Sequence, residues 1–244
     1  MPVEVKRYDA VIFDLYGTLV PSMRDDSYLP SLRQTAAMVG AAETDFIRVW
    51  REEDTLEGRM NGRFVTKADC VSYVCERLGL SPSGQAIQEA ARIRAEFGRQ
   101  LLRPRPDAIA TLTKLRGGGL KLGLMSACSA DTPILWPQTL MAPHLDEVVF
   151  SCQVNLNKPD ARFYQITCDR MSVESRQCLY VGDGDGDELA GAKRVGMEAV
   201  LLCPPGEEDI ILAREGTRTW DGLRISRLSE VLPIVGLALD GVSG

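Results

Sequence analysis

The feature that most constrains the fold of this chain is a short apolar run near its N-terminus that ends in an acid. The apolar residues 11–13 are followed at once by Asp14, and Gly17 comes three residues later. An apolar run without polar alternation is typical of a strand that is covered on both faces, as in the centre of a parallel sheet. The sequence therefore predicts a buried central strand over residues 8–15, with Asp14 close to its carboxyl end.

From residue 104 onward, strand-like and helix-like segments alternate. We expect strands over 120–125, 147–151, 178–181 and 199–202, and helices over 106–116, after Pro159 and over 188–195. Alternation of this kind is typical of an α/β fold in which helices cover both faces of a doubly wound parallel sheet. The second half of the chain therefore supplies the partners of the first strand.

Residues 22–103 show a different pattern, because their apolar residues recur at spacings of three and four. Such spacing places apolar side chains along one face of a helix. One such stripe runs through Ala86, Ala90, Ile93, Phe97 and Leu101. Thr66, and Ser81 followed by Pro82, are typical of helix starts. We therefore predict an all-helical domain over residues 21–103, inserted into a core made of residues 1–20 and 104–244.

Composition and charge restrict the possible partners. The formal net charge is -6, so the chain has no basic field that would hold nucleic acid or an anionic membrane surface. No segment approaches the roughly 18 uncharged apolar residues that span a bilayer, and the N-terminus lacks the pattern of a signal peptide. We expect a cytoplasmic protein that acts on a small anionic molecule, held by a local cation or a metal; monomer and homodimer both stay open.

Cysteine and histidine usage excludes several kinds of site. The seven cysteines are scattered without C-x-x-C spacing, which argues against a disulfide framework or a zinc site and favours a reducing compartment. His144 is the only histidine, so nucleophiles that depend on a neighbouring histidine are close to excluded.

Polar side chains follow the ends of several predicted strands. In open parallel sheets, functional groups gather beyond the carboxyl ends of the strands. These positions hold Asp14, Tyr16, Thr18, Ser126, Lys158, Asp183, Asp185 and Asp187. A carboxylate, a hydroxyl, an ammonium group and an acidic loop together suit displacement at an anionic centre, where they would attack, bind the substrate, neutralise charge and hold a metal.

Four motifs in this order resemble those of the haloacid dehalogenase-like superfamily. They are the run D-L-Y-G-T-L from Asp14, Ser126 after a strand, the run K-P-D from Lys158, and the run G-D-G-D-G-D with Asp183 and Asp187. The block 21–103 stands where family members carry a helical cap. The resemblance implies a Rossmann-like core in which Asp14 attacks the substrate as a nucleophile, assisted by Ser126 and Lys158, and water releases the aspartyl intermediate.

Two features of the sequence resemble the branch that displaces halide from 2-haloacids. Tyr16 stands where phosphatases of the family carry a second aspartate, the general acid and base, and the dehalogenases carry tyrosine at this position. Arg51, preceded by Val49 and Trp50, resembles the cap segment whose arginine binds substrate and halide in that branch, and Tyr164 matches one of its tyrosines.

The acidic loop instead resembles the phosphatases. Carboxylates this close together repel one another unless a cation lies among them, and Mg2+ prefers oxygen ligands. The resemblance implies a Mg2+ site formed by Asp14, the backbone carbonyl of Tyr16, Asp183 and Asp187, with Tyr16, Thr18, Arg51 and Ser126 binding the substrate.

Three hypotheses follow for the function. The leading one is a Mg2+-dependent phosphatase that acts on a small phosphorylated metabolite through Asp14. The alternative is a metal-independent 2-haloacid dehalogenase that uses Asp14 with Arg51. The third is a binding or regulatory protein with little catalysis, which the missing general acid motivates.

Overall fold

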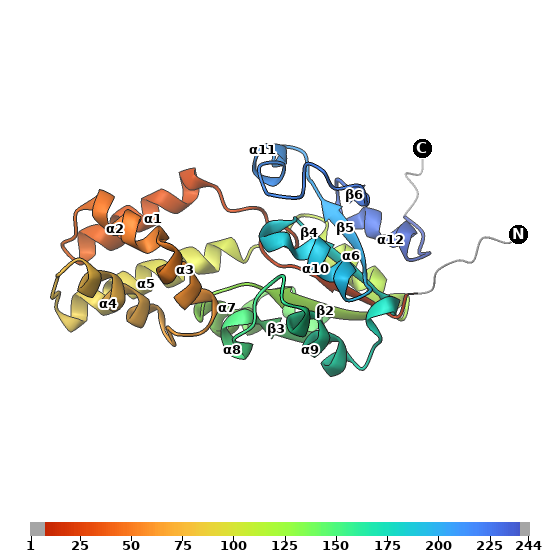
Figure 1. Ribbon diagram of the computed structural model, residues 1–244, viewed down its shortest axis with the longest axis horizontal. Coiled ribbons are helices and arrows are strands. Elements are labelled where there is room, and N and C mark those ends of the chain that lie inside the picture. Colours follow the sequence, from red (N-terminus) through yellow and green to blue (C-terminus); the bar gives the residue numbers. More distant parts are fainter. Residues whose placement is uncertain (1–7, 240–244) are drawn as a thin grey trace, which may run out of the picture.

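The computed structural model describes residues 8–239, which form a parallel sheet with a helical insertion (Figure 1). The strands are β1 (Ala10–Phe13), β2 (Lys121–Ser126), β3 (Glu147–Phe150), β4 (Cys178–Gly182), β5 (Glu198–Leu202) and β6 (Leu223–Ile225). Their order in the sheet is β3-β2-β1-β4-β5-β6, and every pair is parallel. All four residues of β1 are buried, which confirms the central strand. The sequence does not indicate β6, whose three residues include two exposed ones.

Helices cover both faces of this sheet. They are α6 (Ala108–Gly117), α7 (Asp131–Leu135), α8 (Ser151–Val154), α9 (Ala161–Met171), α10 (Glu188–Arg194), α11 (Glu208–Ile211) and α12 (Val231–Ile234), with the short 3-10 helices η1 (Trp136–Gln138), η2 (Ala142–His144), η3 (Ser175–Gln177), η4 (Asp185–Asp187) and η5 (Leu228–Glu230). Because side chains alternate along a strand, Val11 and Phe13 join a core cluster with α6, and Ala10 and Ile12 join another with α9. This two-sided packing confirms the doubly wound α/β core.

The segment between β1 and α6 is helical throughout its regular elements. It contains α1 (Asp25–Met38), α2 (Glu43–Arg51), α3 (Glu53–Met60), α4 (Lys67–Arg77) and α5 (Gly84–Leu101). These helices lie together at one end of the molecule, away from most of the sheet (Figure 1), and they share a core cluster of their own. The expected inserted helical part is thus present, and its boundaries at residues 21 and 103 stay a prediction. None of the helices within residues 8–239 is long and apolar enough to cross a membrane.

Local capping explains where two of these helices begin. The Thr66 side chain accepts a hydrogen bond from the backbone N–H of Asp69, and the Asp69 carboxylate accepts one from the N–H of Thr66. The predicted start of α5 at Ser81 is two residues early, because the Ser83 side chain caps the helix.

The loop after β1 is anchored by a buried ion pair. The Arg105 guanidinium donates hydrogen bonds to the backbone carbonyls of Gly17 and Thr18, both at 2.8 Å. It also pairs with Glu207 at 2.7 Å, and the Glu207 carboxylate accepts a hydrogen bond from the N–H of Ser22. Burial favours protonated Glu207, but the bonds from Arg105 and Ser22 outweigh it and lower the pKa of Glu207 to about 2. This cluster fixes the connection between the sheet and α1.

Candidate active site

Three adjacent strands bring their following residues to one edge of the sheet. Asp14 follows β1, Ser126 is the last residue of β2, and Asp183 follows β4. Because β1 lies between β2 and β4, these residues gather where the strand order reverses direction, the usual place for a site in an open α/β sheet.

Asp14 is a buried carboxylate with one oxygen held and one without a partner. Its Oδ1 is 2.5 Å from the Lys158 ammonium, and its Oδ2 has no hydrogen-bond partner among the described residues. Burial raises the pKa of Asp14 to about 6; Lys158 opposes this rise and Glu188 adds to it. The Asp14 N–H donates to the carbonyl of Val181 in β4 at 2.9 Å, so the backbone is held as well.

Lys158 joins two carboxylates in the interior. Its ammonium lies 2.5 Å from Asp14 and 2.5 Å from Glu188, and its side chain is only 4% exposed. Burial alone would lower the pKa of Lys158, but the two carboxylates outweigh burial and raise it above its ordinary value. The lysine is therefore charged, and it favours the ionised form of Asp14.

Glu188, which sequence reasoning missed, is fully buried beside the nucleophile candidate. Its Oε2 accepts hydrogen bonds from Lys158 and from the Tyr180 hydroxyl at 2.7 Å, and its Oε1 accepts one from the N–H of Gly184 at 2.9 Å. Tyr164, the residue that matches the dehalogenase branch, donates to the backbone carbonyl of Glu188. Tyr180 thus holds the side chain of Glu188, and Tyr164 holds its backbone.

Asp187 does not join this group, although the motif pointed to it as a metal ligand. It has a left-handed backbone with φ of 54°, and its side chain is 53% exposed and pairs with Arg194 at 3.4 Å. Glu188, one residue later, begins α10 and faces inward. The left-handed backbone at Asp187 turns the chain so that Glu188, and not Asp187, faces inward. The spacing of the acids in the sequence does not reveal this turn.

Three buried carboxylates form a potential cation site. Asp14, Asp183 and Glu188 each offer an oxygen, and these oxygens lie within 4.8 Å of one another. Gly17 packs against this group: a Cβ at position 17 would lie 1.6 Å from Asp183 Oδ2, and its φ is +86°. Only glycine fits there, which explains the glycine of the first motif.

Arg214 neutralises part of this acidic group. It forms an ion pair with the Asp183 carboxylate, and it donates to the backbone carbonyl of Asp183 at 2.9 Å. Burial raises the pKa of Asp183 well above its usual range, with Glu188 and Asp14 adding to the rise and Arg214 opposing it.

The residues present fit a divalent cation. Lys158 and Arg214 supply two positive charges against three carboxylates, which leaves one negative charge. The donors are carboxylate oxygens, as Mg2+ prefers. The Asp183 carboxylate can bind such an ion only in competition with Arg214.

The remaining core residues of the predicted site lie at the same edge or near it. Ser126 and Thr18 are fully buried, and neither hydroxyl has a hydrogen-bond partner among the described residues. The Tyr16 hydroxyl lies 3.0 Å from the Thr132 hydroxyl, and burial is the main reason that the pKa of Tyr16 lies above its usual range. The substrate and metal roles of these three residues stay predictions.

A cavity of about 380 Å³ lies between the helical insertion and these loops. Its core wall includes Tyr16, Cys128 and Thr132, from the segments after β1 and β2, and its helical wall includes Trp50, Phe97 and Leu101. The cavity therefore lies beside the loops that follow β1 and β2, and Asp14 itself is not among its lining residues.

Arg51 reaches this cavity but is already paired. Its side chain is 43% exposed and lies 2.5 Å from the Asp25 carboxylate. Two buried arginines that sequence reasoning missed, Arg59 and Arg94, line the same cavity. The insertion thus presents three guanidinium groups there.

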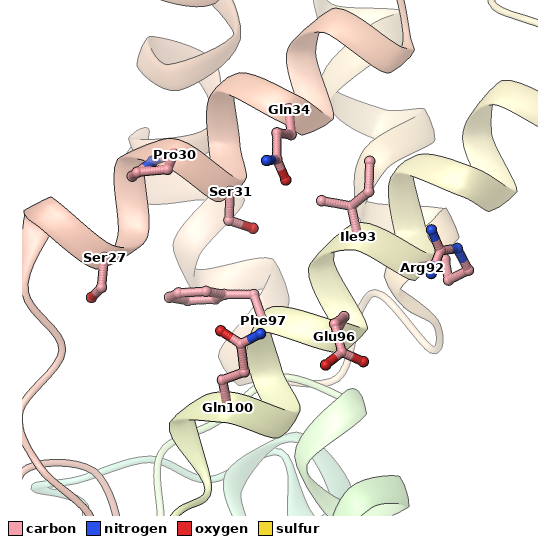
Figure 2. A pocket seen from close by; sticks show the side chains of 9 residues that line it. All are labelled: Ser27, Pro30, Ser31, Gln34, Arg92, Ile93, Glu96, Phe97 and Gln100. Atoms are coloured by element: carbon pink, nitrogen blue, oxygen red, sulfur yellow. The ribbon is translucent and has the colours of Figure 1, made fainter.

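A separate groove of about 330 Å³ runs along the insertion between α1 and α5 (Figure 2). Polar side chains such as Arg92, Glu96 and Gln100 border it, and Ser31 and Phe97 line it from the two helices. Because its lining comes from the insertion, this groove is distinct from the candidate active site.

Known proteins of two activities are similar to this chain. Glyceraldehyde 3-phosphate phosphatase of Methanopyrus kandleri is 28% identical over 79% of this chain and 83% of its own length. (S)-2-haloacid dehalogenase 4A of Burkholderia cepacia is 27% identical over 81% of this chain and 84% of its own. The two activities therefore stand side by side among the relatives.

Solved structures with the same fold also include both activities. A HAD phosphatase from Thermococcus onnurineus is 24% identical, with a TM-score of 0.63 over 93% of this chain and 98% of its own. The 2-haloacid dehalogenase from Pseudomonas syringae pv. tomato is 20% identical, with a TM-score of 0.68 over 93% of this chain and 98% of its own. A model of the hydrolase family described as haloacid dehalogenase-like hydrolase matches residues 8–196. Together with the fold described above, this match shows that the chain belongs to the haloacid dehalogenase-like hydrolases.

Proposed function

We propose that this hydrolase is a Mg2+-dependent phosphatase that forms a covalent aspartyl-phosphate on Asp14. The observation that carries the proposal is the buried group of Asp14, Asp183 and Glu188, whose oxygens lie within 4.8 Å of one another. Two further buried carboxylates beside the nucleophile bring negative charge that a divalent cation would offset. Asp14 and Asp183 would hold the ion, together with the Tyr16 carbonyl and with Glu188 in place of Asp187.

The chemistry of the chain's own residues follows from their contacts. Asp14 Oδ2, which has no partner, attacks phosphorus, and the bond from phosphorus to the leaving oxygen breaks. Water then attacks phosphorus, the bond from phosphorus to Asp14 Oδ2 breaks, inorganic phosphate leaves, and Asp14 returns to its carboxylate. Lys158 keeps Asp14 ionised and offsets the charge of the approaching phosphoryl group. Bound Mg2+ would supply the further positive charge that this group requires.

Tyr16 shapes the choice of substrate within this proposal. It stands at the position of the usual general acid, but its hydroxyl is bonded to Thr132 and its pKa lies above the usual range, so it is a poor proton donor. The enzyme should therefore favour leaving groups that need little protonation. A small phosphorylated metabolite suits the cavity of about 380 Å³ and the similarity to glyceraldehyde 3-phosphate phosphatase.

One observation favours the second candidate, a 2-haloacid dehalogenase. Arg214 and Lys158 already offset two of the three carboxylates, so the chain itself removes most of the charge that a metal would neutralise. Tyr16 and the position of Arg51 at the cavity agree with that branch.

Metal dependence distinguishes the phosphatase from the 2-haloacid dehalogenase. p-Nitrophenyl phosphate and 2-chloropropionate are assayed with Mg2+ and with EDTA. We expect phosphate release with Mg2+ alone, a weakened Mg2+ response in Asp183→Asn, and an unchanged one in the matched control Asp187→Asn, whose carboxylate is exposed. Halide release in EDTA without phosphate release would overturn the proposal.

A further inference from the structure

Two arginines of the insertion are buried against one indole ring. Arg59 in α3 is 7% exposed and Arg94 in α5 is 5% exposed. Their guanidinium carbons lie 4.7 and 5.0 Å from the centroid of the Trp50 ring. Stacking on an aromatic ring fixes the planes of both groups without using their N–H donors.

Their hydrogen-bond partners are neutral. Arg59 donates to the backbone carbonyl of Trp50 at 2.8 Å, and Arg94 donates to the Ser31 hydroxyl at 2.8 Å. The Arg94 Nε is buried without a partner, and neither guanidinium forms an ion pair with a carboxylate in residues 8–239. Burial is the main reason that the pKa of Arg94 is lowered.

The acidic side chains of the shared cavity are committed elsewhere. Asp131 pairs with Lys67 at 2.8 Å, and Asp25 pairs with Arg51 at 2.5 Å. Asp185 belongs to the acidic loop of the core, where its side chain is 78% exposed. Among the described residues no carboxylate forms an ion pair with either arginine, and only Asp131, which pairs with Lys67, lies near enough to Arg94 to favour its charged form.

A buried charge without a counter-ion is unfavourable, and two like charges against one ring add repulsion. An anionic molecule in the cavity would offset this charge. We propose that Arg59 and Arg94 bind a second anionic group of the substrate, a carboxylate or a phosphate, while the reacting group lies at Asp14. The substrate is then a small molecule with anionic groups at both ends. This inference rests on the proposed function only for what happens at Asp14.

The first test measures anion binding without turnover. Acetate and inorganic phosphate are titrated by calorimetry in EDTA into the full chain and into Arg59→Met and Arg94→Met, which keep much of the apolar volume. The matched control is Arg92→Met, because Arg92 lies on the same helix, is exposed, pairs with Glu89 and borders the outer groove (Figure 2). We expect each buried variant to weaken binding roughly 10- to 100-fold, the loss typical of charge-assisted hydrogen bonds, and the control to match the wild type.

Stability separates this role from a structural one. An arginine that serves only to hold Ser31 or the Trp50 carbonyl would lower the melting temperature when it is replaced. A binding arginine that is buried without a counter-ion should leave the melting temperature of the anion-free protein unchanged or raise it on replacement by Met. Wild-type protein that binds neither anion, or variants that bind as well as the wild type, would overturn the inference. If Arg94→Met does not fold, Arg94→Lys keeps the charge and should still lose the affinity that depends on the fork of donors.

Turnover then identifies the anionic group. Hydrolysis of p-nitrophenyl phosphate, which has no second anionic group, is compared with that of 2-phosphoglycolate and of a small bisphosphate. The buried variants should raise KM for one of the doubly anionic substrates at least tenfold and leave p-nitrophenyl phosphate within about threefold. A chain without phosphatase activity would defeat the proposed function but could still pass the calorimetric test.

Discussion

The core and the helical insertion both bury cations, but the chain surrounds these cations differently in the two regions. In the core, the chain supplies Lys158 with two carboxylates at 2.5 Å. In the insertion, Arg59 and Arg94 meet only neutral partners. The core therefore pairs its buried lysine with carboxylates of the chain, whereas the two buried arginines of the insertion form no ion pair among the described residues. The difference suggests fixed catalytic groups on the sheet and substrate selection on the helices.

The largest expected effect concerns the core alone. Asp14→Asn removes the nucleophile at nearly constant volume, so turnover should fall by roughly three orders of magnitude or more while the fold is kept. Initial rates measure turnover, and a far-UV circular dichroism spectrum checks that the fold is kept. A variant that keeps a tenth of the wild-type rate would rule out the covalent mechanism.

Replacing one buried cation in the core and one in the insertion shows whether the two regions differ in stability. Lys158→Met leaves Asp14 and Glu188 buried without their cation, so we expect a loss of about 3–5 kcal/mol in the free energy of unfolding. Arg94→Met leaves no carboxylate unpaired and should lose far less. Urea unfolding at pH 7 measures both. Equal losses in the free energy of unfolding would show that the insertion needs its buried arginine as much as the core needs Lys158.

A smaller effect is expected where the two regions join. Glu207→Gln removes the charge that pairs with Arg105, which should cost about 3 kcal/mol at pH 7. Since the pKa of Glu207 is lowered from 4.5 to about 2 in the folded state, its stabilisation is complete above pH 4.5 and is lost as the pH falls from there to about 2. Unfolding curves of wild type and variant should therefore converge towards pH 2. A difference that stays constant with pH would contradict this role.

The smallest effect is expected at the cavity wall. Tyr16→Phe removes one hydrogen bond to Thr132, which should cost about 1 kcal/mol and change the rate less than about tenfold, since Tyr16 is a poor acid. Thermal unfolding and steady-state kinetics with p-nitrophenyl phosphate check it. A loss of a hundredfold in kcat would mean that Tyr16 takes part in the chemistry.

The fold and the gathering of Asp14, Ser126 and Asp183 at one edge of the sheet could be predicted from the sequence because local patterns determine them. The apolar run before Asp14 could be buried only as a central strand, and the spacing of apolar residues in 22–103 allowed only helices. The edge residues followed from where parallel strands end. These features depend on periodicity, which a sequence shows directly.

The inner acid depends on backbone geometry that the sequence does not show. Asp187 and Glu188 are adjacent acids, and a left-handed turn at Asp187 decides that Glu188 faces Lys158. One signal was available: Glu188 shares a helical face with Gly191 and Ala192, which are buried. Apolar periodicity continued backwards by one turn points to Glu188.

The arginines of the cavity depend on packing between distant segments. Arg51, Arg59 and Arg94 look alike in the sequence as helix residues with charged neighbours. Only the fold shows that Asp25 neutralises Arg51 and that Trp50 covers the other two. No local sequence pattern distinguishes an arginine in a surface ion pair from a buried arginine that lacks an ion-pair partner.

The Arg105 cluster has a mechanical consequence. Arg105 holds the carbonyls of Gly17 and Thr18, and its partner Glu207 holds Ser22, so the chain leaving the sheet and the chain returning to it are fastened at one point. If the helices swing open to admit a substrate, the bending must occur beyond that point, in the short segments next to α1 and α5. The hinge then lies outside the loop that carries Asp14, and substrate entry does not disturb the alignment of the attacking oxygen.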